Sequence, residues 1–228
     1  MSRKLKALVC IAHPDDEALF FSGLIATKKY DWTIVCATDA NADGLGAERK
    51  KRFQKSCRLL GIKKYIYFDF PDVFDQRLNI DEFIQKLQDL NKENQFDLVF
   101  THGILGEYGH QHHQDVCYSV YTSFSKKTKI YSVAYNTFPE MRIALSQKIF
   151  NLKTQLLWKV YAEDTKSLLH FLPATSDEGF IQIEAREVNE IYHFLTGKKK
   201  LNKKNLKVYA WLYDYIMGKN YELKARPF

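Results

Sequence analysis

The sequence has few cysteines, and they lie far apart. Only four occur among the 228 residues, at Cys10, Cys36, Cys57 and Cys117. A disulfide framework is typical of short secreted chains with closely spaced cysteines, so this length and spacing argue against one. Because Cys10 and Cys36 sit inside apolar, strand-like runs, we expect all four to be reduced and buried as small hydrophobic side chains.

Long apolar stretches are also absent. No segment approaches the roughly 20 apolar residues that a membrane-spanning helix needs. Arg3, Lys4 and Lys6 stand near the start, but only a six-residue apolar stretch follows them before a polar cluster. That stretch is too short for the hydrophobic core of a signal peptide. We therefore expect a soluble, cytoplasmic protein with no membrane span.

The chain does contain ample material for a folded core. Its hydrophobic fraction of 46% argues against disorder, and its length suits one domain or a domain with an appendage. The net charge of +7 is spread widely and is densest at residues 198–207, which we interpret as a solvated linker or helix face. Nucleic acid is therefore not an expected partner, whereas a homo-oligomer remains open.

Strand and helix patterns alternate over the first 140 residues. Apolar or β-branched runs predict strands at residues 5–12, 31–38, 64–68, 96–101 and 129–135. Amphipathic spacing predicts helices at residues 17–28, 47–60, 80–90 and 114–124. This alternation predicts an α/β fold, with a Rossmann-like, mostly parallel sheet and helices on both of its faces.

The pattern changes after residue 140. Helical spacing at residues 146–163, 187–195 and 208–217 predicts a helical C-terminal extension, with a short strand at residues 179–183. We therefore divide the chain into a core at residues 1–165 and an extension at residues 166–228 that packs on the same domain.

Two polar clusters directly follow predicted strands. The first, Ala-His-Pro-Asp-Asp-Glu at residues 12–17, ends the first strand, and the second, Gly-Glu-Tyr-Gly-His-Gln-His-His at residues 106–113, follows the fourth. Because the carboxyl ends of parallel strands meet at one edge of the sheet, we expect both clusters to form a single site. Histidines and acids gathered in this way are typical of a metal ion with an activated water beside it.

Three residues of these clusters are the best metal ligands. A catalytic zinc site usually has three protein ligands and one open position. His13 and Asp16 come from one tight turn, and His113 can complete the set. Asp15 then lies beside the metal, where it could accept the proton of a water. The same two-histidine, one-carboxylate set also suits iron(II).

The other histidines of the second cluster differ in position. His110 precedes His113 by three residues at a helix entry, so the two can share a face. In its protonated form His110 could stabilise an oxyanion or protonate a leaving amine. His112 would point elsewhere.

The paired motifs resemble those of the LmbE/PIG-L family of zinc-dependent N-deacetylases. The resemblance rests on Ala-His-Pro-Asp-Asp after the first strand and Gly-Glu-Tyr-Gly-His-x-x-His after the fourth, and covers about residues 5–165. It implies that His13, Asp16 and His113 bind one zinc ion per chain. It also implies that Asp15 is the general base and that His110 is its electrostatic or acid partner.

The resemblance further implies two roles near the substrate. The sequence also departs from the usual pattern of the family at two positions. Tyr108 matches a tyrosine that assists the oxyanion, and Arg49 matches a substrate-binding arginine. The family commonly has an acid one place before the last ligand, where this chain has His112, so a carboxylate that would orient His110 is missing. The helix that carries Arg49 often has an acid three positions later, where this chain has Arg52.

The function implied is removal of an N-acetyl group from an N-acetylated sugar or glycoconjugate, such as one containing N-acetylglucosamine, by metal-activated water. Two alternatives remain open at this point. The chain could be an amidase of another N-acylated small molecule with the same catalytic residues. It could also be a non-catalytic sugar-binding relative, although such a protein has no need for a base at Asp15.

Overall fold

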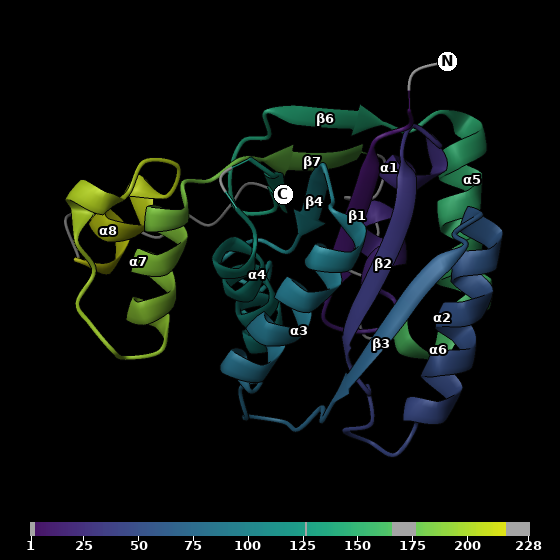
Figure 1. The fold of residues 1–228 in the computed structure, drawn as a ribbon, viewed down its shortest axis with the longest axis horizontal. Coiled ribbons are helices and arrows are strands. Elements are labelled where there is room, and N and C mark those ends of the chain that lie inside the picture. Colours follow the sequence, from purple (N-terminus) through teal and green to yellow (C-terminus); the bar gives the residue numbers. More distant parts are fainter. Residues whose placement is uncertain (1–2, 126, 166–176, 218–228) are drawn as a thin grey trace.

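The computed structural model describes residues 3–125, 127–165 and 177–217, which share one seven-stranded sheet (Figure 1). The strand order is β3-β2-β1-β4-β5-β7-β6. Strands β1 to β5 are parallel, and β7 pairs antiparallel with both β5 and β6. The strands are β1 Lys6–Ile11, β2 Asp31–Thr38, β3 Lys64–Phe70, β4 Leu98–Thr101, β5 Lys129–Val133, β6 Met141–Ala144 and β7 Asp177–Ile181. This topology confirms the predicted Rossmann-like fold.

Helices cover both faces of the sheet, as predicted. In Figure 1, α3 and α4 lie on one side of the sheet and α1, α2 and α5 on the other. The helices are α1 Ser22–Ala26, α2 Gly46–Leu60, α3 Ile80–Asn94, α4 Gln111–Ser123, α5 Gln147–Gln155, α6 Ala162–Thr165, α7 Ala185–Leu195 and α8 Ala210–Ile216. Shorter turns are η1 Glu17–Phe21, η2 Leu156–Val160 and η4 Lys203–Asn205.

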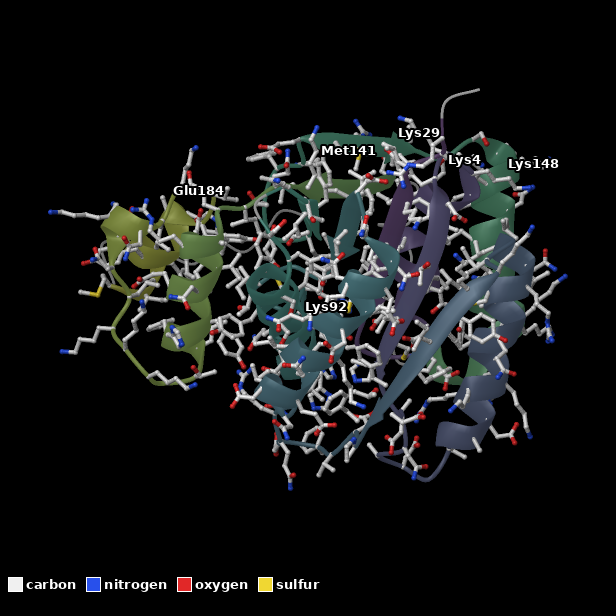
Figure 2. All side chains as sticks on the ribbon, in the orientation of Figure 1. Lys4, Lys29, Lys92, Met141, Lys148 and Glu184 are labelled. Carbon is white, nitrogen blue, oxygen red and sulfur yellow. The ribbon has the colours of Figure 1, made fainter. Side chains whose placement is uncertain are left out.

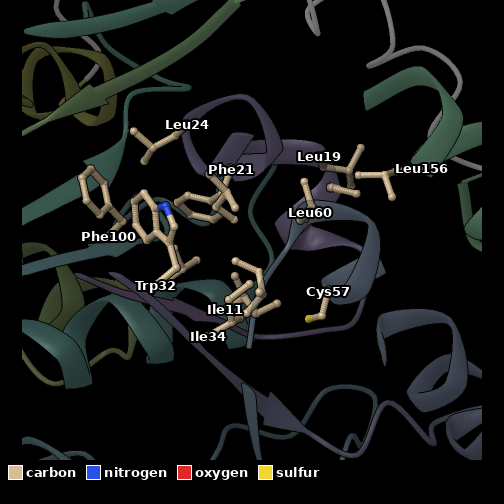
Figure 3. Close-up of a cluster of buried hydrophobic side chains, with 14 of the residues drawn as sticks. Ile11, Leu19, Phe21, Leu24, Trp32, Ile34, Cys57, Leu60, Phe100 and Leu156 are labelled. Atoms are coloured by element: carbon tan, nitrogen blue, oxygen red, sulfur yellow. The ribbon is translucent and has the colours of Figure 1, made fainter. Parts of the chain in front are cut away.

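The central strand β1 contributes side chains to two hydrophobic layers, one on each face of the sheet. Its side chains alternate between faces, so Val9 and Ile11 join the layer under α1 and α2, whereas Leu8 and Cys10 join the layer under α3 and α4. Figure 3 shows part of the first layer. Burial on both faces explains why β1 reads as a continuous apolar run, and it fixes the strand end from which the first polar cluster emerges.

Cysteines and charges lie where the sequence indicates. All four cysteines are buried and free, which confirms that no disulfide framework exists. The lysines labelled in Figure 2, among them Lys4, Lys29 and Lys148, project outward and are exposed. Residues 198–207 connect α7 to α8, and most of their lysines are exposed, consistent with a solvated linker. Among the described residues, no helix is both long and apolar enough to cross a membrane.

The single helix predicted at residues 146–163 is wrong in detail. The segment forms α5, then the π-helical turn η2, and the chain breaks at Tyr161 before the short α6. The amide of Tyr161 donates to the carbonyl of Leu156, five residues back, and its hydroxyl donates to Glu17 Oε1 at 2.6 Å. This wider turn places the buried tyrosine against the first polar cluster, a constraint that helical spacing does not reveal.

The C-terminal part contains both a strand and a small helical lobe. Strand β7, which falls within the expected extension, is a strand of the main sheet. Helix α7, η4 and α8 form the lobe, and α7 packs against α4 (Figure 1). The buried carboxylate of Glu187 accepts hydrogen bonds from the backbone amides of Lys207, Val208 and Tyr209, which holds the connection to α8 in place. Strand β6 was not predicted.

Candidate active site

A tight turn at the end of β1 presents the first polar cluster. Asp15 has a φ of 111°, a backbone conformation that residues other than glycine rarely adopt. Its backbone carbonyl accepts from the amides of Ala18 and Leu19, and its own amide donates to Glu17 Oε2 at 3.1 Å. The turn therefore reverses the chain at once and directs the Asp15 side chain toward the cavity described next.

The site is a cavity of about 640 Å³ at the carboxyl ends of the parallel strands. This edge lies at the lower side of Figure 1, where the arrowhead of β3 ends. Five segments line it: the turn after β1, the loop and helix start after β2, the loop after β3, the second polar cluster, and the short helix α6. Its lining includes His13, Asp15, Asp16, Ala40, Asp43, Arg49, Asp72, Phe74, Tyr108, His110, His112 and Asp164. The two clusters thus meet, as predicted.

A glycine brings the second cluster into position. Gly106 has a φ of +69°, and a β-carbon there would lie 2.3 Å from the carbonyl oxygen of His110. The amides of Gly109 and His110 both donate to the carbonyl of Gly106. This close turn sets His110 at the N-cap of α4, so that the histidines of the first helical turn face the end of β1.

The proposed ligands Asp16 and His113 adjoin each other in the interior. Asp16 Oδ1 lies 3.4 Å from His113 Nε2, and Asp16 Oδ2 lies 3.7 Å from His13 Nδ1. His113 Nδ1 donates to Glu107 Oε2 at 2.5 Å, which leaves the lone pair on Nε2. Nε2 is buried and has no hydrogen-bond partner. A buried, unpartnered imidazole nitrogen facing a carboxylate fits a metal ion.

Several overlapping groups in this region have metal-ligand spacing. Among the described residues, three sets bring one donor atom from each member within 4.8 Å of the others. The sets are His13 with His110 and His113, His13 with Asp72 and His112, and Asp16 with His102 and His113. None of them joins His13 to Asp16, so the predicted set of His13, Asp16 and His113 stays a prediction.

His102 and Glu107 are site residues that sequence reasoning missed. The buried ring of His102 stacks on His113 with centroids 3.8 Å apart, and its nitrogens lie 3.2 Å from Asp16 Oδ2 and from Glu107 Oε2. Burial opposes its charged form, but the carboxylates of Glu107 and Asp16 outweigh burial and raise the pKa of His102 to about 9. His102 directly follows β4, just as His13 lies two residues after β1, and that position could have revealed it.

Burial raises the pKa of both Asp15 and Glu17. Burial, followed by the charge of Asp16, raises the pKa of Asp15 well above its usual range. Burial also raises the pKa of Glu17 to about 7, despite the hydrogen bond from Tyr161. A carboxyl group whose pKa is raised toward neutral pH is a stronger proton acceptor than an ordinary carboxylate, which suits it to proton transfer.

His110 is neutral, in contrast to the protonated form considered from the sequence. Burial and the neighbouring rings of His113 and His13 lower the pKa of His110 to about 3. Its Nδ1 accepts from the amide of His112 at 3.3 Å, so the proton of the neutral ring resides on Nε2. The ring lies parallel to that of His113, with centroids 4.7 Å apart. His110 can therefore act as a neutral hydrogen-bond donor.

Tyr108 and Arg49 both reach the cavity, in different environments. Tyr108 is 43% exposed at the rim, and its ring centroid lies 5.5 Å from that of His113. Arg49 already makes two hydrogen bonds of 2.7 Å to Asp43, and its Nε donates to Asp164 at 3.0 Å. Arg52 also donates to Asp164, at 2.7 Å. The guanidinium of Arg49 is thus held at the mouth of the site by acidic side chains.

The chain matches known sequences over its first half. The family model described as PIG-L, GlcNAc-PI de-N-acetylase, matches residues 8–124. The chain is 34% identical over 116 residues to the N-acetylglucosaminyl-phosphatidylinositol de-N-acetylase of Bos taurus, covering 47% of this chain and 46% of that protein. It is 30% identical over 123 residues to the enzyme of the same name from Saccharomyces cerevisiae, covering 48% and 40%. The chain spans about half the length of the curated relatives it matches.

Solved structures share the fold. N,N'-diacetylchitobiose deacetylase from Pyrococcus horikoshii superposes with a TM-score of 0.65 at 19% identity, covering 80% of this chain and 85% of that one. A 4-carboxy-2-hydroxymuconate hydratase from Pseudomonas putida gives a TM-score of 0.59 at 14% identity, covering 78% and 96%. Because a hydratase and a deacetylase share this fold, the fold alone does not identify the reaction.

Proposed function

Because the chain belongs to the PIG-L family, whose model spans residues 8–124, we propose that it is a zinc-dependent N-deacetylase of N-acetylated amino sugars or their conjugates. One observation carries the proposal. The buried, unpartnered Nε2 of His113 faces Asp16 across 3.4 Å, and Asp15 lies in the adjoining cavity wall. A ligand set with a separate carboxyl group beside it is what metal-assisted hydrolysis requires, whereas a sugar-binding module needs no such carboxyl.

The donor set fits zinc. His13, Asp16 and His113 would hold the ion, and their nitrogen and oxygen donors match those of catalytic zinc sites. Bound there, the metal supplies a Lewis acid that polarises an amide carbonyl and lowers the pKa of a water. Since two histidines and one carboxylate also suit iron(II), metal analysis of the purified protein discriminates between the two ions.

The protein's own groups supply the proton transfers. Asp15, in its ionised form, accepts a proton from the attacking water, and its raised pKa lets it keep that proton. The same carboxyl group can then deliver the proton to the departing amine. Neutral His110 offers its Nε2 hydrogen to the carbonyl oxygen as negative charge develops there. We assign Tyr108, whose ring lies at the rim beside His113, as a second donor to that oxygen.

The substrate class follows from the relatives and the cavity. The names of the curated relatives include de-N-acetylases of N-acetylglucosaminyl-phosphatidylinositol and a deacetylase of a 2-acetamido-2-deoxy-glucopyranoside of myo-inositol. A cavity of about 640 Å³ is within the size range of small-molecule sites. Asp43 and Asp72 in its lining can accept hydrogen bonds from sugar hydroxyls. Arg49 would contact the substrate from the mouth of the cavity.

Acetate release from a panel of substrates tests this function. The panel contains N-acetylglucosamine, its glycosides and inositol conjugates, nucleotide-activated N-acetyl sugars, and N-acylated amines without a sugar. We expect zinc-loaded protein to release acetate only from members with an N-acetylated amino sugar. Hydrolysis confined to the sugar-free amides would show a different amidase. Absence of release across the panel, with one equivalent of zinc bound, would contradict deacetylation.

A further inference from the structure

The His13 ring faces different groups through its two nitrogens. Nδ1 lies 3.7 Å from Asp16 Oδ2, on the side of the proposed catalytic ligands. Nε2 lies 3.3 Å from His112 Nδ1 and 3.7 Å from Asp72 Oδ1, on the side of the cavity wall. The second set, which consists of His13, His112 and Asp72, therefore uses Nε2 of His13. The first set, which consists of the proposed catalytic ligands His13, Asp16 and His113, needs only Nδ1.

The second set already has the dimensions of a metal site. The three donor atoms, His13 Nε2, His112 Nδ1 and Asp72 Oδ1, form a triangle. Its third edge, from His112 Nδ1 to Asp72 Oδ1, measures 3.4 Å. A tetrahedral zinc ion with bonds of about 2.0–2.1 Å separates its ligand atoms by about 3.3–3.4 Å. Edges of 3.3, 3.4 and 3.7 Å thus leave room for such an ion with little movement of the side chains.

We propose that His13 Nε2, His112 Nδ1 and Asp72 Oδ1 form a second site for a divalent transition metal, beside the catalytic one. Two imidazoles and one carboxylate select zinc, cobalt or nickel over calcium or magnesium, which prefer oxygen ligands. His112 stands where the resemblance places an acid, so this ligand set is a property of this chain.

Hydrogen bonds orient the two ligands that the second site adds to His13, namely His112 and Asp72. His112 Nε2 donates to the backbone carbonyl of Gln76 at 2.7 Å, which directs the lone pair of Nδ1 toward His13 and Asp72. Histidine ligands of metals are usually fixed in this manner by their second nitrogen. The backbone amide of Asp72 donates to Asp39 Oδ1 at 3.0 Å, which anchors the start of the loop that carries the carboxylate.

The far end of that loop is fixed to α4. Arg77 donates through Nη1 to Asp115 Oδ1 at 2.5 Å and through Nη2 to Gln114 Oε1 at 2.8 Å. The amide of Leu78 donates to Asp115 Oδ2 at 3.0 Å. Since Asp115 and His112 share the first turns of α4, these bonds hold the Asp72 loop and His112 in a constant relation.

The two sites are coupled through one ring. An imidazole can bind a metal through each nitrogen only by giving up its N–H proton, so the second ion binds less tightly than the first. His13, Asp72 and His112 all line the cavity, and an ion bound to them would occupy space that the substrate needs. Excess zinc should therefore inhibit the enzyme by filling this site.

Metal stoichiometry tests the proposal without reference to turnover. Metal-free full-length protein is dialysed against rising concentrations of zinc, and its bound metal is measured by mass spectrometry. We expect two equivalents for the wild type, and one equivalent for His112→Gln and for Asp72→Asn. The His112→Gln side chain keeps a donor toward Gln76, and His193→Gln, on the distant α7, is the matched control that should still bind two.

Two outcomes would overturn the proposal: saturation of the wild type at one equivalent, or two equivalents retained by both variants. The wild-type measurement needs no substitution, so a variant that fails to fold does not remove the test. As a second measurement, Asp16→Asn disrupts the first set alone, and titration with cobalt should still show one bound ion by its visible absorption. Because these readouts count ions, loss of the second site is distinguishable from failure of the proposed deacetylase activity.

Discussion

Asp15 combines an unusual backbone conformation with a raised pKa. A φ of 111° outside glycine costs of order 1–3 kcal/mol, and such strain persists where the surrounding structure enforces it. Here the enforcing contacts are the hydrogen bond from the Asp15 amide to Glu17 and the two amides that bond its carbonyl. This conformation keeps the Asp15 carboxyl group at the cavity, while the side chain of Asp16, which also borders the cavity, is almost fully buried.

Substituting Asp15 by asparagine separates metal binding from catalysis. We expect Asp15→Asn to lower turnover by about 10²–10⁴-fold, because it removes the proton acceptor. Bound metal should stay at the wild-type level, since Asp15 belongs to none of the three ligand groups. The control is Asp31→Asn, an exposed acid at the start of β2. Loss of the metal in Asp15→Asn would refute this division of roles.

Glu17 makes stability depend on pH. In the folded, metal-free protein its pKa is about 7, above the usual value of 4.5. Between these two pH values the folded state therefore keeps a proton that the unfolded state has already lost. Raising the pH from 4.5 to 7 therefore lowers the free energy of unfolding, by roughly 3 kcal/mol. Glu17→Gln should lack this contribution. Urea unfolding of both proteins at several pH values measures it, and a pH-independent difference would contradict the account.

At the scale of elements, the site depends on loops held by buried polar bonds. The loop after β3 is tied to α4 through Asp115, which is fully buried and accepts from Arg77, from Leu78 and from Tyr192 of α7. The C-terminal lobe thus supports a wall of the cavity from behind. The ring of Tyr192 also stacks on Tyr118 of α4, with centroids 4.0 Å apart.

Tyr192→Phe tests this support. The change removes one donor from the buried carboxylate of Asp115 and keeps the ring, so we expect a loss of about 1–3 kcal/mol in the free energy of unfolding. Urea denaturation monitored by circular dichroism measures it. An unchanged midpoint would mean that Arg77 and Leu78 satisfy Asp115 without α7.

Elements with strong local patterns could be predicted, and those set by distant contacts could not. Strands β1 to β5 are apolar runs, and the sequence predicted all five. Strand β6 has only four residues, Met141–Ala144, which alternate between half-buried and exposed. Its pairing with β7 involves residues 33–39 positions later in the sequence. The π-helical turn η2 likewise depends on the distant bond between Tyr161 and Glu17.

The same distinction applies to the site. Motif spacing brought Asp15, Asp16, His110 and His113 together at one sheet edge. The expectation that His112 points elsewhere is wrong, because its ring lines the cavity and lies 3.3 Å from His13 Nε2. The role of His102 arises from its stacking on His113 and from two carboxylates, contacts that only the folded chain creates. The neutral state of His110 likewise comes from burial and from neighbouring rings. Asp72 reaches the site from the loop after β3, which contains no recognisable motif.

At the scale of the whole molecule, the ligands join separate parts of the fold. His13 and Asp16 follow β1, whereas His113 lies on α4, about a hundred residues later. A bound ion would therefore link these elements in the folded state only. Ligands that bind only the folded state stabilise it by mass action, by about 2.7 kcal/mol when the free ion is at a hundred times its dissociation constant.

Removal of the metal should lower the melting temperature. For a chain of this length, about 2.7 kcal/mol corresponds to a decrease of roughly 5–11 °C. Differential scanning calorimetry of zinc-loaded and chelator-treated protein measures the difference. Addition of zinc to the treated protein should restore the higher value. Identical melting curves would show that no ion binds at these residues under the conditions used.

The measurement that tests the central claim most directly is the oxygen isotope content of the released acetate. Zinc-loaded protein is incubated in ¹⁸O-labelled water with the N-acetylated amino sugar that gives the strongest signal in the panel. We expect acetate carrying one ¹⁸O atom, equimolar with free amine, no release from metal-free protein, and release slowed by about 10²–10⁴-fold in Asp15→Asn. Acetate without the label, or its release by the metal-free protein, would contradict hydrolysis by metal-activated water.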